Sequence, residues 1–217
     1  MIGMVLAAGA GKRLGSLTED LPKTLLEVDG DRTILDIALG NFAAVGFEEA
    51  VSVTGFAAER IDERLEALSD RYGLSLRTVF NPKALEWNNA YSLWCARDEF
   101  ARGVLLANGD TVHPSSVQET LLSGRNGDDL VIALDQAKTL GEEEMKVHLS
   151  AEGQLDRIHK TLEPSTGARK YARTSANQAG GSFVQLVGLH AVLQRAVSHE
   201  TLLWDVLVVA REAHREA

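Results

Sequence analysis

Cysteine is almost absent from this chain, because Cys95 is the single one among 217 residues. A disulfide within the chain is therefore impossible, which excludes the small secreted scaffolds that disulfides hold together. A chain of this length buries roughly 70% of its unfolded surface, so it needs no such cross-link. It also has no apolar run near the roughly 18 residues of a membrane span. The first residues, Met1–Leu6, lack the basic start of a signal peptide, so we expect a cytoplasmic protein with no membrane partner.

Positive charge is also scarce. The chain has 22 Lys and Arg against 31 Asp and Glu, which gives a formal net charge of −9. This balance argues against nucleic acid as a general partner, although a local basic patch can still bind phosphate groups. The composition does not decide between a monomer and a homodimer.

Short apolar segments alternate with segments of helical periodicity over the first 134 residues. Strands are predicted at 2–7, 49–54, 74–80, 104–107 and 130–134. Helices are predicted after Thr33 with Asp36 as its capping partner, at 61–72, at 88–100, and from Pro114 with Ser115 and Gln118 as cap partners. This alternation predicts an α/β protein with a mostly parallel central sheet and helices on both faces. Ligands of such sheets bind beyond the carboxyl ends of the strands.

The pattern changes after residue 134. Met145, Val147 and Leu149 alternate with polar residues, and Leu155 and Ile158 continue this alternation after a turn, which predicts a small β-hairpin. Residues 161–182 are polar and weakly patterned, and a strand at 183–189 and a helix at 202–213 are expected beyond them. No linker divides the chain, so we expect one domain over residues 1–217.

The strongest motif is the run LAAGAGKRL at residues 6–14, followed by Pro22-Lys23. Glycines after a strand let backbone N–H groups approach a phosphate, and Arg13 and Lys23 add positive charge beside them. The run is not a P-loop, because Arg13 stands where Ser or Thr is required. It is not a dinucleotide-binding fingerprint either, because Leu14 replaces the third glycine. A nicotinamide-dependent oxidoreductase is therefore disfavoured.

This run resembles the signature of the sugar-phosphate nucleotidyltransferase superfamily. The segment Trp87–Ser92, WNNAYS, is similar to one in bacterial phosphocholine cytidylyltransferases, and Asn108-Gly109-Asp110 resembles the metal-binding motif of the family. Residues 144–147 and 158–160 also look like that subfamily. The resemblance covers about residues 1–164, whereas residues 165–217 read as a divergent or truncated acceptor-side segment.

The resemblance implies a Rossmann-like nucleotidyltransferase fold, Mg²⁺ as cofactor, and transfer of a cytidylyl group from CTP to phosphocholine with release of pyrophosphate. Arg13 and Lys23 would be catalytic, Asp110 a Mg²⁺ ligand, and Asp205 a second metal ligand on a fainter resemblance. The expected nucleotide-binding residues are Leu6, Ala7, Ala8, Gly9, Gly11, Lys12, Arg13 and Asn88. The expected acceptor-binding residues are Trp87, Asn89, Tyr91, Lys146 and Lys160.

Several alternatives stay open. Trp87, Tyr91 and Trp94 could bind a quaternary ammonium group by cation–π attraction, but spacings of four and three also fit the core stripe of a helix. The acceptor could instead be an inositol phosphate or a sugar phosphate, with another nucleotide as donor. A further possibility is a catalytically weak, nucleotide-binding regulatory domain. Cys95 is expected to be an inert thiol.

Overall fold

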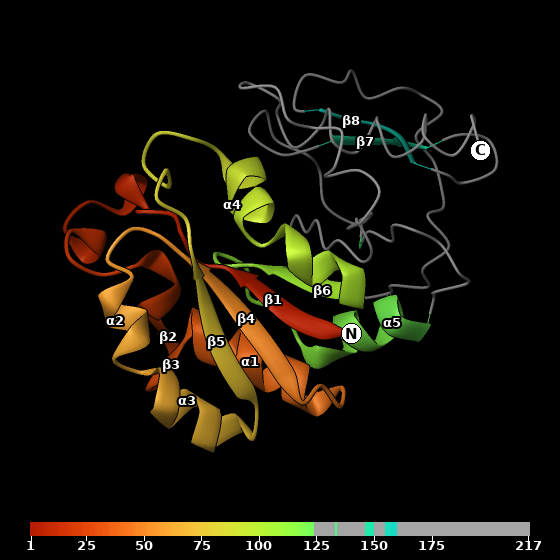
Figure 1. Ribbon diagram of the computed structural model, residues 1–217, viewed down its shortest axis with the longest axis horizontal. Helices are drawn as coiled ribbons and strands as arrows, with labels where there is room; N and C mark the ends of the chain where they lie inside the picture. Colours follow the sequence, from red (N-terminus) through yellow and green to blue (C-terminus); the bar gives the residue numbers. More distant parts are fainter. Residues whose placement is uncertain (124–132, 134–145, 150–154, 160–217) are drawn as a thin grey trace.

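The central feature of the fold is a four-stranded parallel sheet. The computed structural model describes residues 1–123, 133, 146–149 and 155–159. The strands are β1 (Ile2–Leu6), β4 (Glu49–Thr54), β5 (Ser75–Phe80) and β6 (Val104–Asn108), in the order β5-β4-β1-β6. All three pairings are parallel, so the carboxyl ends of the strands meet at one edge (Figure 1). The predicted parallel sheet is confirmed, while the strand expected at 130–134 lies outside the described residues apart from the buried Ala133.

Strand β1 runs through the middle of this sheet. All five of its residues are buried, which explains its unbroken apolar sequence. Leu6, its last residue, is in register with Val53 of β4 and Asn108 of β6. The segments that follow β1 and β6 therefore begin side by side at the same edge.

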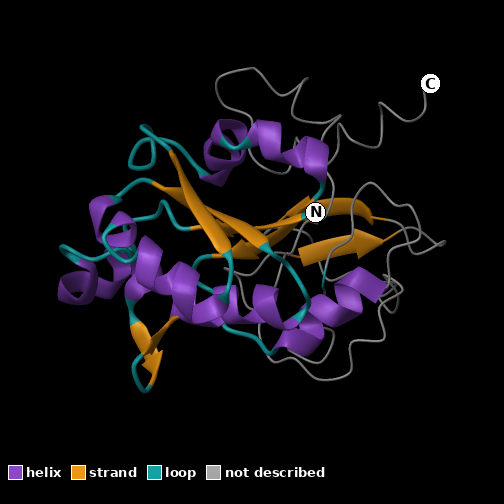
Figure 2. Cartoon of the chain, turned by 60° about the horizontal axis from the view of Figure 1, so that its bottom comes forward, coloured by secondary structure: helices purple, strands orange, loops and turns teal. Residues whose placement is uncertain are grey.

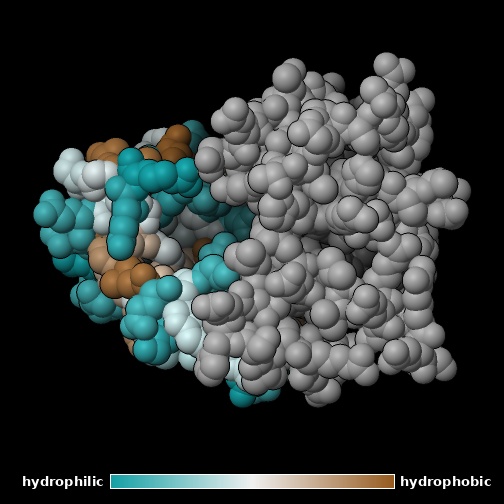
Figure 3. All heavy atoms as spheres, turned by 90° about the horizontal axis from the view of Figure 1, so that it is seen from above, coloured by the Kyte–Doolittle hydropathy of each residue, from teal (hydrophilic) through white to brown (hydrophobic). Residues whose placement is uncertain are grey.

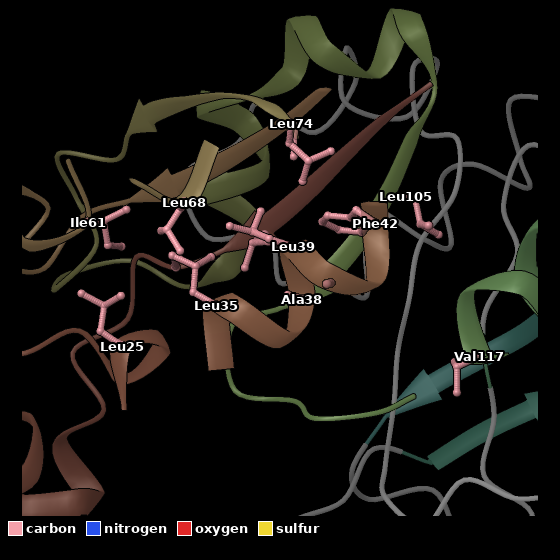
Figure 4. Close-up of a cluster of buried hydrophobic side chains, with 14 of the residues drawn as sticks. Leu25, Leu35, Ala38, Leu39, Phe42, Ile61, Leu68, Leu74, Leu105 and Val117 are labelled. Atoms are coloured by element: carbon pink, nitrogen blue, oxygen red, sulfur yellow. The ribbon is translucent and has the colours of Figure 1, made fainter. Parts of the chain in front are cut away.

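Helices cover both faces of the sheet, as the sequence predicts (Figure 2). Helices α1 (Ile34–Ala44), α3 (Leu65–Tyr72) and α5 (Ser115–Ser123) pack together on one face, and α4 (Asn89–Cys95) lies against the other. The core between α1 and the sheet is built mainly from leucine and alanine side chains, together with Phe42 (Figure 4). Its labelled members include Leu35, Leu39, Phe42, Leu68, Leu74 and Leu105.

The first turn of α1 is fixed by the predicted capping box. The hydroxyl of Thr33 accepts a hydrogen bond from the N–H of Asp36 at 3.1 Å, and the N–H of Thr33 donates to Oδ2 of Asp36 at 3.0 Å. Tyr72 and Arg71 of α3 donate to the other carboxylate oxygen at 2.8 and 3.1 Å. Burial alone would raise the pKa of Asp36, but the hydrogen bonds from Thr33, Tyr72 and Arg71 outweigh it and lower this pKa.

Two predicted helices are interrupted. The helix expected at 61–72 is divided into α2 (Glu59–Asp62) and α3, because the N–H of Arg64 bonds three residues back to Ile61 and tightens the turn. The helix expected at 88–100 becomes α4 followed by the 3₁₀ helix η3 (Arg97–Arg102). In both cases the apolar periodicity continues across the break, so periodicity alone does not reveal it.

The expected cap of α5 is wrong. The hydroxyl of Ser115 lies 3.5 Å from Glu119, one turn further along α5, rather than beside Gln118. Gln118 is completely buried, and its amide has no partner among the described residues. Gln118 therefore faces inward from α5 and does not satisfy the N–H groups of the first turn.

Two small antiparallel hairpins accompany the main sheet. Strands β7 (Lys146–Leu149) and β8 (Leu155–His159) form the hairpin that the sequence predicts. Strands β2 (Glu27–Asp29) and β3 (Arg32–Thr33) form one that it does not. The strand and helix expected at 183–189 and 202–213 lie outside the described residues.

On the face seen in Figure 3, the coloured residues are mainly hydrophilic, with separate apolar patches between them. Leu17, Phe80 and Leu85 are exposed apolar side chains, and such single exposures are ordinary in folded proteins. None of the helices in the described part of the chain has the length and apolar character needed to cross a membrane.

Candidate active site

The glycine-rich loop leaves the end of β1 and turns into the 3₁₀ helix η1 (Lys12–Thr18). Gly11 has φ of +62°, a left-handed conformation that glycine adopts without strain. Its carbonyl accepts hydrogen bonds from the N–H of Leu14 at 2.8 Å and from the hydroxyl of Thr18 at 3.1 Å. A side chain at Gly11 would also lie 3.1 Å from Cβ of Lys23. The loop therefore needs glycine here both to turn and to let Lys23 approach.

Lys23 begins the short 3₁₀ helix η2 (Lys23–Leu25), which is anchored by the buried side chain of Leu25. The N–H of Leu25 donates to the carbonyl of Pro22 at 2.8 Å. From this anchor, Nζ of Lys23 reaches Oδ2 of Asp110 at 3.1 Å. The two side chains are 27% and 52% exposed, so the ion pair lies in the wall of a cleft rather than in the core.

The turn after β6 packs directly against η2 and the end of β1. A Cβ atom at Gly109 would overlap with the carbonyl oxygen of Leu6 and with Cγ2 of Thr24. Only glycine therefore lets these three segments meet. The hydroxyl of Thr24 is buried beside this contact and has no partner among the described residues.

These segments enclose a cleft of about 550 Å³ at the carboxyl edge of the sheet. It is lined by the predicted site residues Leu6, Ala7, Gly9, Gly11, Lys12, Arg13, Lys23, Asn89 and Asp110. It is also lined by Leu14 and Thr24, and by Asn108 and Gly109, which precede Asp110 in its motif but are not themselves among the expected binding residues. The sequence motif Asn108-Gly109-Asp110 could have indicated a role for Gly109. Nothing in the sequence indicates one for Thr24, which only its contact with Gly109 in the structure places at the cleft. Three cationic side chains and one carboxylate thus face one space, a charge pattern suited to a polyphosphate.

Two predicted nucleotide-binding residues lie beside the cleft and have structural contacts. Ala8 is buried, and its carbonyl accepts a hydrogen bond from the N–H of Phe56 at 3.0 Å. Asn88 is the N-cap of α4, where its Oδ1 accepts a hydrogen bond from the N–H of Ala90 at 2.9 Å. Their contact with a nucleotide stays a prediction.

The aromatic residues of this segment do not form a simple core stripe. The rings of Trp87 and Tyr91 meet edge to face with centroids 4.6 Å apart, and Trp87 is 38% exposed. Trp94 is partly buried, with the guanidinium of Arg97 lying 4.6 Å from its ring centroid. Trp87 and Tyr91 therefore present an aromatic pair at the start of α4, the helix that brings Asn89 to the cleft.

The remaining predicted site residues lie on or beyond the β7–β8 hairpin. Lys146 is on β7 and is paired with His159 of β8. Lys160 and Asp205 lie outside the described residues. The described ranges hold no group of three His, Cys, Asp or Glu side chains arranged for a metal ion. Asp110 alone still fits Mg²⁺, which proteins commonly hold with one or two carboxylates together with substrate phosphates and water.

Cys95 takes no part in the cleft. It is partly buried near the end of α4, and burial raises the pKa of its thiol, an effect that the nearby Arg97 only partly opposes. A raised pKa disfavours the nucleophilic thiolate.

Comparison with known proteins gives a consistent result. Residues 3–179 match the MobA-like NTP transferase domain. Over 118 residues the chain is 39% identical to CMP-5'-(3-aminopropyl)phosphonate synthase of Streptomyces rubellomurinus, a match that covers 54% of this chain and 18% of that protein. Over 106 residues it is 31% identical to choline-phosphate cytidylyltransferase of Streptococcus pneumoniae, covering 49% and 43% of the two chains.

Solved structures agree on the fold. The inositol-1-phosphate CTP transferase from T. maritima aligns over 98% of this chain and 81% of its own, with a TM-score of 0.70 and 22% identity. The CTP:phosphocholine cytidylyltransferase from Streptococcus pneumoniae aligns over 98% and 86%, with a TM-score of 0.60 and 19% identity. In sequence, this chain spans less than half the length of the two curated relatives above. Because the family match extends over most of the chain, from residue 3 to residue 179, the protein belongs to the MobA-like NTP transferase domain family.

Proposed function

We propose that the protein is a nucleotidyltransferase that moves a cytidylyl group from CTP to phosphocholine and releases pyrophosphate. The observation that carries this proposal is the single cleft in which the glycine loop, Arg13 and Lys23 face Asp110. Backbone N–H groups and cations can bind the triphosphate there, and a carboxylate stands beside them for a divalent cation.

The reaction needs positioning and neutralisation of charge more than it needs a reactive side chain. An oxygen of the acceptor phosphate attacks the α-phosphorus of the nucleotide, a new P–O–P bond forms, and the bond to pyrophosphate breaks. The attacking oxygen is already ionised at neutral pH, so no general base is required. In this proposal the loop at Gly9 and Gly11 holds the triphosphate, Lys12 and Arg13 neutralise its β- and γ-phosphates, and Lys23 binds the reacting phosphates.

Asp110 is the residue that would hold Mg²⁺ in this cleft. The bound cation would supply additional neutralisation of the triphosphate and of the departing pyrophosphate. Asp110 lies at the cleft wall with half of its side chain exposed, so it can reach such a cation without rearrangement of the core. Asp205 as a second ligand, and Lys146 and Lys160 as acceptor-binding residues, remain part of the proposal.

The acceptor is proposed from the aromatic pair. Faces of Trp and Tyr rings attract quaternary ammonium groups with roughly 0.5–2 kcal/mol each. Trp87 is exposed and rests edge to face on Tyr91, close in sequence to the cleft residue Asn89. The names of the two relatives above denote phosphocholine and 3-aminopropylphosphonate, which both join a cationic nitrogen to a phosphoryl group. These observations support a small acceptor that bears a cationic nitrogen and a phosphate or phosphonate.

The test is pyrophosphate release by the full chain with Mg²⁺, CTP and phosphocholine. ATP, GTP and UTP serve as parallel donors, and 3-aminopropylphosphonate, inositol 1-phosphate and glucose 1-phosphate serve as parallel acceptors. We expect release that requires both CTP and phosphocholine. Pyrophosphate release with a different acceptor would identify that acceptor as the substrate in place of phosphocholine. Nucleotide binding without pyrophosphate release from any donor–acceptor pair would overturn the enzyme assignment in favour of a regulatory nucleotide-binding domain.

A further inference from the structure

We infer that Lys23 has a second role, as the internal counter-ion of the metal-binding carboxylate Asp110, which makes metal and triphosphate binding depend on each other. This inference rests on the proposed function, because it assigns the metal to Asp110 and the phosphates to Lys23. Its basis is the contact of 3.1 Å between Nζ of Lys23 and Oδ2 of Asp110. The hydroxyl of Thr111 lies 3.3 Å from the other oxygen, so both carboxylate oxygens have partners within the protein.

The pair is a product of backbone packing rather than a chance meeting of two long side chains. Lys23 and Asp110 are 87 positions apart in sequence, but each is next to a residue of one tight contact, Thr24 against Gly109. Cβ of Lys23 is also close to the backbone of Gly11. The two Cα positions are therefore fixed by the scaffold, and only the lysine side chain needs to move to separate the charges.

This arrangement gives the two side chains competing partners. A divalent cation that binds Asp110 must displace the ammonium group of Lys23 or lie within a few ångströms of it, and like charges at that distance repel. A phosphate oxygen that draws Lys23 away leaves the carboxylate of Asp110 available for the cation. By thermodynamic reciprocity, a cation on Asp110 equally leaves Lys23 available for the phosphate. Each ligand thus removes an obstacle to the other, in addition to any direct contact between them.

The first experiment measures Mn²⁺ binding to the full chain without nucleotide, by electron paramagnetic resonance. Lys23→Gln should tighten Mn²⁺ binding about threefold or more. The substitution removes the ion pair that competes with the cation for Asp110, and it also removes the repulsion between the ammonium group and the cation. Lys12→Gln is the matched control, because Lys12 lines the same cleft and makes no ion pair among the residues that the structure describes. An equal effect of the two substitutions, or no effect of Lys23→Gln, would overturn the inference.

The second experiment measures binding of inorganic triphosphate in the presence of EDTA, by calorimetry. Asp110→Asn should tighten this binding about two- to fivefold in the wild-type background, because Lys23 is no longer held by the carboxylate. The same substitution in a Lys23→Gln background should bring no such gain. Equal gains in both backgrounds would show a general effect of negative charge and would contradict the role of the pair.

Neither titration requires turnover, an acceptor or the correct base, so the inference is separable from the proposed function. Absence of pyrophosphate release with every substrate pair would overturn the enzyme assignment, while the Mn²⁺ titration would still decide the role of Lys23. Circular dichroism on each variant checks that the fold is retained, which we expect because neither side chain lies in the core.

Discussion

Lys23 and Asp110 are 87 positions apart in the chain, yet their charged atoms lie 3.1 Å apart in the wall of the cleft. The first prediction concerns the lysine. Lys23→Ala should lower turnover by roughly two orders of magnitude or more, because it removes the cation placed where charge develops on the reacting phosphates. The melting temperature should change little, since a partly exposed ion pair contributes about 1 kcal/mol or less. Steady-state kinetics and thermal unfolding on the same preparation test both statements, and turnover near the wild-type level would refute the role of Lys23.

Asp110→Asn should weaken Mg²⁺ binding, so that the half-saturating Mg²⁺ concentration changes, and it should lower activity at the same time. The amide keeps the shape of the side chain but removes the negative charge that a hard cation prefers. The measurement is a Mg²⁺ titration of initial rate at saturating nucleotide, with Glu19→Gln as the control, because Glu19 lies outside the cleft that holds Asp110. A half-saturating Mg²⁺ concentration unchanged in Asp110→Asn would show that the metal binds elsewhere.

Gly109→Ala should reduce both stability and activity. The added methyl group would overlap with the carbonyl of Leu6 and the side chain of Thr24, and forced overpacking of this kind costs about 1–3 kcal/mol. Gly9→Ala is a matched control for stability, because a Cβ at Gly9 would meet no atom within 4 Å. Chemical denaturation of both variants makes the comparison, and equal stabilities would mean that the three segments can separate at little cost.

The aromatic pair predicts how the acceptor is recognised. Trp87→Ala should raise the KM for phosphocholine roughly three- to thirtyfold, as expected from loss of a cation–π contact, and leave the KM for CTP nearly unchanged. Trp87→Phe keeps an aromatic face and should restore most of the affinity. If the two KM values rise by the same factor, Trp87 supports the cleft as a whole and does not bind the choline group.

The parts of this fold that the sequence predicts are those that depend on local pattern. The strands, the capping box of Thr33 and Asp36, and the β7–β8 hairpin each follow from neighbouring residues. The grouping of the glycine loop and Asp110 in one cleft follows from the rule that parallel strands present their carboxyl ends at one edge, whereas the place of Lys23 beside them was expected only from the family resemblance.

The parts that the sequence does not predict depend on contacts between distant segments. The fit of Gly109 between Leu6 and Thr24 joins three segments, and nothing near any one of them indicates it. The break before α3 lies at Glu63 and Arg64, where the N–H of Arg64 bonds to the carbonyl of Ile61, and the apolar pattern continues across it. Asparagine is a common residue both in ligand-binding sites and at the N-cap of a helix, so the sequence does not distinguish these roles for Asn88. The hydrogen bond from the N–H of Ala90 shows that Asn88 caps α4.

The last prediction concerns stability and pH. The hydrogen bonds to Asp36 lower its pKa in the folded protein, so the ionised carboxylate contributes stability above its unfolded pKa of about 3.9, and that contribution is lost as the pH falls through the folded pKa. Asp36→Asn should therefore destabilise the protein by about 1–3 kcal/mol at pH 7, and the difference from wild type should shrink below about pH 4.

Asp31→Asn is the control: Asp31 also pairs with Arg71, but its side chain is 83% exposed. Urea unfolding at several pH values measures both variants. A difference between Asp36→Asn and wild type that stays constant from pH 7 to pH 3 would show that packing, rather than the charge on Asp36, joins α1 to α3.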